Sequence, residues 1–258
     1  MRLYLPCQMC LQNRVTEQDF MMKDFRDLMY PAIYSDGGYF QFVCDCGHHN
    51  FVMLQEQKFE MLFQIGANAI LDGYYREAVS SFTSSLERFY EFCVRIFSRK
   101  HGVDPKVVKQ ATAFYTNSSE RQFGSFLFLY LIEFKKLPIT KSKDKKMREF
   151  RNQVIHNGKI PSRDEAVWYG NEVRVLVLKM ILLLQERYSE QIQELVMETL
   201  HEKLLHNDSS GGVVSTMSGG CILSLANGMI EQALTRNLEQ DLSDLQKMRE
   251  MMKIHYGK

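Results

Sequence analysis

The sequence lacks a strong excess of charge, a long uncharged apolar run and an apolar leader. The formal net charge of its 258 residues is +1, so any basic surface that binds nucleic acid must be local. The richest apolar run, residues 173–184, contains Arg174 and Lys179 and is shorter than the roughly 18 uncharged residues of a membrane helix. The first ten residues lack the apolar core of a signal peptide. These absences predict a cytoplasmic protein that does not contact a membrane.

The sequence does contain enough apolar material for a core. Hydrophobic residues make up 45% of the chain and aromatic residues 12%, which argues against wholesale disorder. The length suits one large domain, or one domain with a small module. Six cysteines are present, of which four lie close together near the start, while Cys93 and Cys221 stand alone. In a cytosolic chain, close cysteine pairs indicate a metal site rather than disulfides.

Residues 1–54 have a different pattern from the rest of the chain. After the Gly37-Gly38 turn, aromatic and β-branched residues alternate, which is typical of short strands. From about residue 55 onward, apolar residues recur at spacings of three and four, which predicts helices. We therefore predict a mainly α protein with four parts: a zinc-ribbon-like module at 1–54, a helical domain at 55–206, a flexible loop at 207–221 and a C-terminal helix at 222–258.

The helical part begins with a long amphipathic segment. Gly66 and the pair Asp72-Gly73 mark places where this segment divides into two helices. The buried face of its second half is predicted to carry Val79, Phe82, Leu86, Phe89 and Cys93. Further helices are expected at about 104–114, 120–137, 145–156, 162–206 and 222–254, and the first turn of the fourth contains the capping pair Ser162 and Glu165.

Four cysteines and two histidines form a candidate metal site. Cys7 and Cys10 have the two-residue gap that lets two thiolates bind one tetrahedral Zn²⁺ from a tight turn. The stretch CDCGHH supplies Cys44, Cys46, His48 and His49 for the second pair. Our first choice of ligands is Cys7, Cys10, Cys44 and Cys46, with His48 as the substitute for one of the second pair.

The metal is expected to be structural. A module of about 54 residues has little core, so a bound Zn²⁺ would stabilise it. A closed site with four protein ligands leaves no open position for catalysis. The module would therefore serve recognition, domain docking or dimerisation. The alternative is a small β module with four reduced, unliganded thiols.

A second candidate site lies in the stretch REFRNQVIHNGKIP, residues 148–161. Arg151 and His156 are roughly 140° apart around a helix, so they do not share a stripe, although a long guanidinium can reach the imidazole. Arg95 and His101 have a similar spacing, which shows that the spacing alone means little. The first pair differs in its context, because Asn152 follows the arginine and a turn follows the histidine directly. The alternative is a helix cap and an exposed imidazole.

The stretch RNQVIHNGKIP, followed by EAVWYGNEVRVLVLKMI, resembles the signature of the HEPN superfamily (higher eukaryote and prokaryote nucleotide-binding domains). The earlier ANAILDGYYREAVSSFTSSLERFYEF is similar to the first long helix of that family, so the resemblance covers about residues 58–190. It implies an antiparallel helical bundle. Many HEPN proteins are metal-independent ribonucleases of toxin, abortive-infection and anti-phage systems. Their motif is an Arg, usually a polar residue, and a His after four to six intervening residues, which Arg151, Asn152 and His156 match.

The resemblance also implies a mechanism and partners. In the family, two motifs commonly face each other across a homodimer, and the ribose 2′-oxygen attacks the adjacent phosphorus to leave 2′,3′-cyclic phosphate and 5′-hydroxyl ends. By this resemblance His156 would transfer the proton, Arg151 would hold the scissile phosphate and Asn152 would orient both. The implied partners are RNA, with tRNA as one candidate, a second copy of the chain, and an antitoxin or other defence-system protein. Gly158 stands where some toxin members have a tyrosine used in neutralisation, so that route of control is in doubt.

Residues 135–151 are locally basic, with eight Lys or Arg residues against two acidic ones. The basic residues predicted to bind RNA phosphates are Lys143, Lys145, Lys146 and Arg148. The alternative is a solvated, lysine-rich loop. Two other functions compete with the ribonuclease: an inactive HEPN dimer that binds nucleic acid or a partner, and a regulatory subunit of a neighbouring toxic protein.

Overall fold

The computed structural model describes residues 2–15, 28–205, 213–226 and 228–256. Within these ranges 65% of the residues lie in ten helices. This confirms the prediction of a mainly helical chain with a small β region near the N-terminus. The chain divides into two compact units. We call residues 1–56, 196–220 and 243–258 the strand unit, and residues 57–195 and 221–242 the helical unit.

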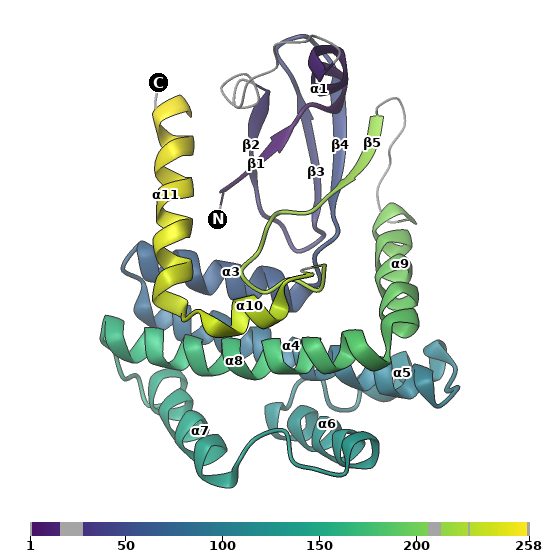
Figure 1. Cartoon of the computed structure of the whole chain (residues 1–258), viewed down its shortest axis with the longest axis vertical. Helices are drawn as coiled ribbons and strands as arrows, with labels where there is room; N and C mark the ends of the chain where they lie inside the picture. The colour runs from purple at the N-terminus through teal and green to yellow at the C-terminus, as the bar shows by residue number, and fades with distance from the viewer. Residues whose placement is uncertain (1, 16–27, 206–212, 227, 257–258) are drawn as a thin grey trace. The chain divides into compact units, whose positions relative to one another are not determined.

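The strand unit contains two small sheets (Figure 1). In the first, β1 (Arg2–Pro6) pairs antiparallel with β2 (Met29–Ile33), and α1 (Gln8–Val15) follows β1. In the second, β4 (His49–Leu54) is the central strand, antiparallel to β3 (Tyr39–Val43) and parallel to β5 (Val213–Met217). Gly38 has a φ of +60°, so the predicted turn before β3 uses a conformation that favours glycine.

Strand β5 lies inside the segment 207–221, so the prediction of a flexible loop is wrong for Val213–Met217. Asn50 of β4 pairs with Val213 and Leu54 pairs with Met217. The Gln55 amide then donates to the Met217 carbonyl at 2.9 Å, which extends the pairing by one bond. The composition of this segment is small and polar, and its strand depends on an edge of β4 that lies far earlier in the chain. Val213, Val214 and Thr216 are β-branched and favour a strand, but the glycines and serines around them predict a loop.

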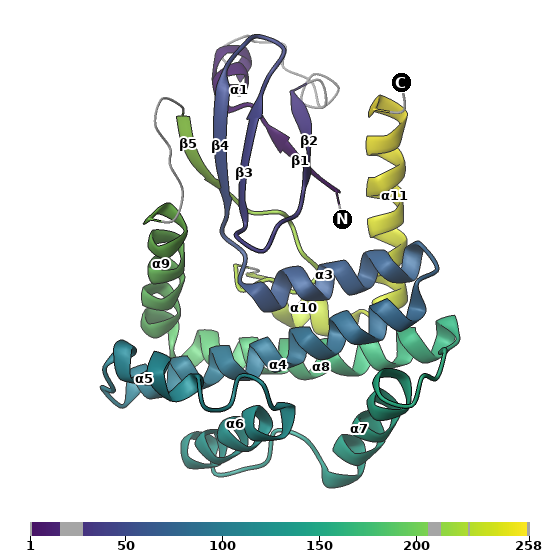
Figure 2. The same cartoon turned by 180° about the vertical axis from the view of Figure 1, so that it is seen from behind.

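The helical unit is built around α4 (Figures 1 and 2), which packs against α3, α6, α7 and α8. Its helices are α3 (Lys58–Leu71), α4 (Tyr75–Lys100), α5 (Pro105–Thr112), α6 (Ser119–Phe134), α7 (Lys141–Ile155), α8 (Arg163–Arg187) and α10 (Ile230–Thr235). Two more, α9 (Ser189–Leu205) and α11 (Leu238–Tyr256), begin in this unit and end in the strand unit. Within the described ranges, no helix has the length and apolar character needed to cross a membrane.

The predicted buried face of α4 is confirmed, since Val79, Phe82, Leu86, Phe89 and Cys93 are all buried. The break before α4 falls at Gly73, whose φ is +82°, and not at Gly66. Gly66 of α3 and Gly170 of α8 instead lie against the ring of Phe82. A Cβ at these glycines would come within 2.6 Å and 2.5 Å of that ring. The two glycines therefore let α3 and α8 approach α4 closely.

Other helix boundaries differ from the predictions. α7 begins at Lys141, where Thr140 accepts a hydrogen bond from the Lys143 amide, so part of the expected basic connection is helical. The expected helix over 162–206 is divided at Tyr188 into α8 and α9. The predicted capping pair is confirmed, because Ser162 and Glu165 form a reciprocal capping box. The segment expected as one helix from 222 contains α10 and α11.

The side chain of Arg174 in α8 is only 1% exposed and holds the C-terminal part of the helical unit. It donates to Asp241 (2.6 Å) and to the carbonyls of Ala233 (2.7 Å) and Arg236 (3.0 Å). Arg174→Met should lower the free energy of unfolding by about 3 kcal/mol, because two carbonyls lose their donor and the Asp241 carboxylate keeps only Arg236.

Denaturant unfolding of the intact protein measures this effect. Arg163→Met is the control, because its ion pair with Glu239 is exposed and is expected to contribute no more than about 1 kcal/mol. Equal losses in the two variants would contradict a structural role for the buried Arg174.

Candidate metal cluster and active site

Four side chains of the strand unit bring one donor atom each to the same point. Cys7 follows β1 and Cys10 lies in α1, while Cys44 follows β3 and His48 precedes β4. The three sulfurs and an imidazole nitrogen all lie within 4.8 Å of one another. The cysteines are buried and the histidine is half-buried. A metal ion could therefore bind here with three thiolates and one imidazole as its ligands.

The distances between donors lie within a few tenths of an ångström of those around a tetrahedral ion. The Nδ1 atom of His48 lies 3.7, 3.3 and 3.3 Å from the sulfurs of Cys7, Cys10 and Cys44. The sulfurs of Cys10 and Cys44 are 3.8 Å apart. Metal–sulfur bonds of about 2.3 Å and metal–nitrogen bonds of about 2.0 Å at tetrahedral angles require donors roughly 3.5–3.8 Å apart. The residues present therefore fit a four-coordinate metal.

The turn between β3 and β4 determines which side chains reach the cluster. The Cys44 amide donates to the His48 carbonyl at 3.1 Å, so these two residues face each other across the turn. Gly47, with a φ of +82°, makes the reversal possible, and its amide donates to the Cys44 carbonyl at 2.8 Å. Burial raises the pKa of the Cys44 thiol, but the His48 amide donates to its sulfur, and the net pKa is lowered to about 7. This turn favours the thiolate that a metal needs.

Cys46, our first choice for the fourth ligand, lies outside this cluster and is exposed. His48, the predicted substitute, supplies the fourth donor instead. The reason is the reversal at Gly47, since Cys46 stands at the tip of the turn while His48 is returned to the side of Cys44. His49, the other candidate, is the first residue of β4 and is exposed. Cys7, Cys10 and Cys44 are placed together as the sequence predicted.

A second group of polar side chains lies at the end of α7 in the helical unit. His156 is the C-terminal cap of this helix, and Arg151 and Asn152 lie in its last turns. The Nη1 atom of Arg151 donates to Oδ1 of Asn152 at 2.8 Å and lies 3.4 Å from Nε2 of His156. The long Arg151 side chain therefore reaches His156, although the two residues lie on different sides of the helix. Val154, fully buried, anchors this turn to the core.

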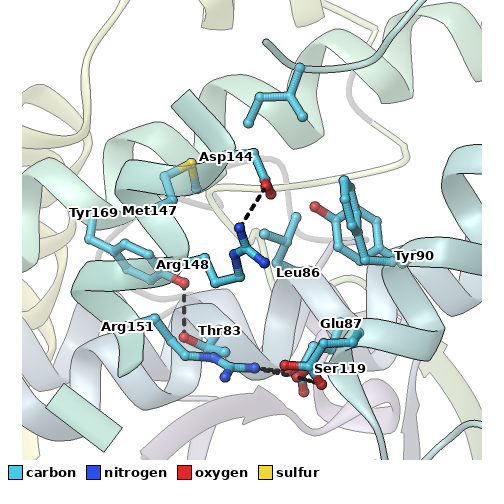
Figure 3. A pocket seen from close by; sticks show the side chains of 13 residues that line it. Thr83, Leu86, Glu87, Tyr90, Ser119, Asp144, Met147, Arg148, Arg151 and Tyr169 are labelled. Atoms are coloured by element: carbon cyan, nitrogen blue, oxygen red, sulfur yellow. Dashed lines mark hydrogen bonds and ion pairs between the residues drawn. The ribbon is translucent and has the colours of Figure 1, made fainter. Parts of the chain in front are cut away.

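Two side chains that sequence reasoning missed hold Arg151 from other helices (Figure 3). Its Nη2 atom donates to Oε1 of Glu87 in α4 at 3.1 Å and to the hydroxyl of Ser119 in α6. The Arg151 side chain is consequently only 12% exposed, whereas His156 is exposed. Glu87 and Ser119 lie 64 and 32 positions before Arg151, and no local spacing linked them to it. The guanidinium is thus fixed in place by four neighbours.

The four predicted substrate-binding cations do not gather beside Arg151. Arg148 lines the same pocket as Arg151 and lies 3.9 Å from Asp144. Lys146 is placed over the Trp168 ring, 4.6 Å from its centre, in a different cavity. The other two form ion pairs, Lys143 with Glu172 and Lys145 with Glu149. Of the four, Arg148 is therefore the best placed to act with Arg151.

No protein-family model, curated protein or solved structure matches the chain. The two sites therefore rest on the side chains that the fold brings together.

His101, the histidine of the second Arg–His spacing, has a different environment from His156. Its Nε2 atom pairs with Oε1 of Glu133, and the other oxygen of that carboxylate accepts from the Tyr188 hydroxyl. These contacts tie the ends of α4, α6 and α8 together. His101 thus forms part of a packing contact, which makes it a useful control for His156.

Proposed function

We propose that this protein is an HEPN-type endoribonuclease that cuts RNA without a catalytic metal, leaving 2′,3′-cyclic phosphate and 5′-hydroxyl ends. The observation that carries the proposal is the contact of Arg151 with His156 and Asn152, with Glu87 and Ser119 holding the guanidinium from behind. A cation fixed in this way can bind a phosphate without first losing conformational freedom.

The role of each of the three residues follows from the chemical groups of its side chain. Arg151 would bind the non-bridging oxygens of the scissile phosphate and stabilise the charge that develops there. His156, exposed at the helix end, would accept the 2′-hydroxyl proton as the 2′-oxygen bonds to phosphorus. The bond to the 5′-oxygen then breaks, and that oxygen takes up a proton. Asn152 would orient the guanidinium, as its hydrogen bond to Nη1 supports.

A single imidazole serves both proton transfers poorly, so we also propose that two chains place their motifs at one composite site. The outer face of α6 supports a homodimer. Phe128, Leu131 and Ile132 lie at spacings of three and four and are 69%, 42% and 53% exposed. Exposed apolar patches of this kind mark interaction surfaces. Ser119, at the start of the same helix, contacts Arg151, which connects this face with the candidate site.

The double variant Phe128→Glu/Ile132→Glu is expected to convert the dimer to a monomer, because it places four like charges in the shared interface. Cleavage at low protein concentration should fall at least tenfold with it. Sedimentation or light scattering checks the mass. Val107→Glu, on α5, is the matched control, since Val107 is 52% exposed and lies outside this face. A double variant that stays dimeric would rule out α6 as the interface.

We further propose that the cluster of Cys7, Cys10, Cys44 and His48 binds a structural Zn²⁺. Support comes from the tetrahedral donor distances and from the soft thiolate-rich donor set. The ion would join α1 to the turn before β4, and it would take no part in RNA cleavage. The strand unit would then present a surface for recognition or docking.

The biological setting follows from the family resemblance. We propose that the ribonuclease is an effector of anti-phage defence, acting in the cytoplasm and restrained by an antitoxin or another protein of the same system. One observation favours the alternative, an inactive HEPN module that binds nucleic acid or a partner. Glu87 neutralises part of the Arg151 charge, so a phosphate must compete with this ion pair.

An RNA cleavage assay tests the proposal. Purified protein is incubated with total RNA and tRNA in EDTA, and its metal content is measured before and after. Cleavage that leaves cyclic phosphate ends supports the enzyme. RNA that binds but remains intact supports the inactive module. If EDTA removes zinc and activity together, the assay is repeated without EDTA on protein that retains its zinc.

A further inference from the structure

The pocket beside Arg151 has walls that the proposed cleavage step does not use. It has a volume of about 180 Å³ and lies between α4, α6 and α7 (Figure 3). Leu86, Phe123 and Met147 provide apolar surface. This volume is far larger than one water needs and smaller than the roughly 300 Å³ of a typical pocket for a drug-sized ligand. A single planar ring with polar edges is the kind of group that suits it.

Tyr90 points to a ligand in this pocket. Its side chain is 7% exposed, and its ring stacks on Phe126 with centroids 4.6 Å apart. Its hydroxyl faces the pocket and has no hydrogen-bond partner among the residues that the structure describes. The hydroxyl of Tyr169, in the same pocket, is by contrast bonded to Thr83 at 2.9 Å. Because this hydroxyl opens on the pocket and no described residue bonds it, Tyr90 can bond a group that enters the pocket.

The polar part of the wall contains carboxylates beside the guanidinium groups of Arg148 and Arg151. The carboxylates of Glu120 and Asp144 both line the pocket. A hydrogen bond from its own backbone amide holds the pKa of Glu120 below its usual value, so this group is charged at neutral pH. Asp144 lies 3.9 Å from Arg148, whose planar guanidinium can stack on an aromatic ring. Amino groups of a ligand would bond these carboxylates, whereas carbonyl oxygens would be repelled.

We propose that this pocket binds the base of the nucleotide whose 3′-phosphate Arg151 holds, and that it selects adenine, cytosine or guanine over uracil. The inference rests on the proposed ribonuclease and names the specificity of its site. Asp144 accepts from the exocyclic amino group, Tyr90 bonds a ring nitrogen or carbonyl, and Arg148 covers the ring. Uracil has no amino group, and its two carbonyl oxygens would face the carboxylates.

Calorimetric titration of the intact protein with the four nucleoside 3′-monophosphates tests this selection without requiring turnover. The three amino-bearing nucleotides should bind at least about tenfold more tightly than uridine 3′-monophosphate. Tyr90→Phe removes only the hydroxyl and should weaken their binding about 3–10-fold. Asp144→Asn should reduce the discrimination against uracil, because an amide can donate to a carbonyl.

Tyr130→Phe is the matched control. Tyr130 is buried in the same aromatic cluster, packs against Phe126 and does not line the pocket, so its variant should bind as the wild type does. Equal affinity for all four nucleotides would overturn the pocket proposal, as would equal effects of the Tyr90 and Tyr130 variants.

The cleavage assay separates this failure from failure of the ribonuclease. RNA cleavage with unselective nucleotide binding retains the enzyme and overturns the base pocket. Selective binding that needs Tyr90 and Asp144, without any cleavage, supports the pocket and overturns the enzyme. In that case the nucleotide-binding alternative is the function that the site performs.

Discussion

Replacing Arg151 or His156 by alanine should lower the rate of RNA cleavage by about 10²–10⁴-fold. The loss of His156 removes the group that transfers the proton, and general acid–base catalysis contributes a factor of this size. The loss of Arg151 removes the positive charge that stabilises the phosphate in the transition state, for which similar factors apply. The measurement is the initial rate on a short RNA, with the end groups identified.

Matched variants show whether the losses are chemical or structural. His101→Ala should retain full activity, since that imidazole pairs with Glu133 away from the motif. Arg151→Lys keeps the charge but cannot bind Asn152, Glu87 and Ser119 together, so most of the loss should remain. The denaturant midpoint of each variant should correspond to a free energy of unfolding within about 0.5 kcal/mol of the wild type, as is usual for surface substitutions. Unchanged cleavage by His156→Ala would contradict the assignment.

Removal of the metal should unfold the strand unit while most of the helical signal in circular dichroism remains. Structural Zn²⁺ contributes about 10–16 kcal/mol of binding free energy in small domains, more than a module of this size gains from its core. The helical unit has its own buried aromatic core, with Phe59, Phe82 and Phe89 almost fully hidden. Elemental analysis should find one zinc per chain, and limited proteolysis should detect the unfolded strand unit.

The cluster itself offers matched pairs of variants. Cys44→Ser and His48→Ala should lose the metal, because both supply donor atoms. Cys46→Ser and His49→Ala should retain it, since neither belongs to the cluster. Metal lost from the Cys46 variant but kept by the His48 variant would restore our first choice of ligands. A wild-type protein with no metal would remove the site altogether.

Local pattern was sufficient for the parts of the fold that depend on neighbouring residues. Apolar residues at spacings of three and four predicted the buried face of α4, since every member from Val79 to Cys93 follows the helical period. The capping box at Ser162 needed only a residue three positions later. Helix ends were less predictable. The division at Tyr188 and the early start of α7 at Lys141 depend on how the chain packs.

Long-range contacts decided what local pattern could not. Strand β5 forms on the edge of β4, and its five residues lie among glycines and serines that predict a loop. The choice of His48 over Cys46 depends on the direction in which the chain reverses at Gly47. Glu87 and Ser119 meet Arg151 only because α4, α6 and α7 pack together.

Local sequence pattern predicted a mainly helical chain, three of the four donors of the candidate metal site, and an Arg–Asn–His motif at a helix end. Each depends on spacing along the chain, which the periods of helices and turns convert directly into position. The fourth donor, the contacts that hold Arg151 and the pocket lined by Tyr90 depend on the tertiary structure. These depend on which distant segments pack side by side, and that is set by the burial of apolar surface across the whole unit.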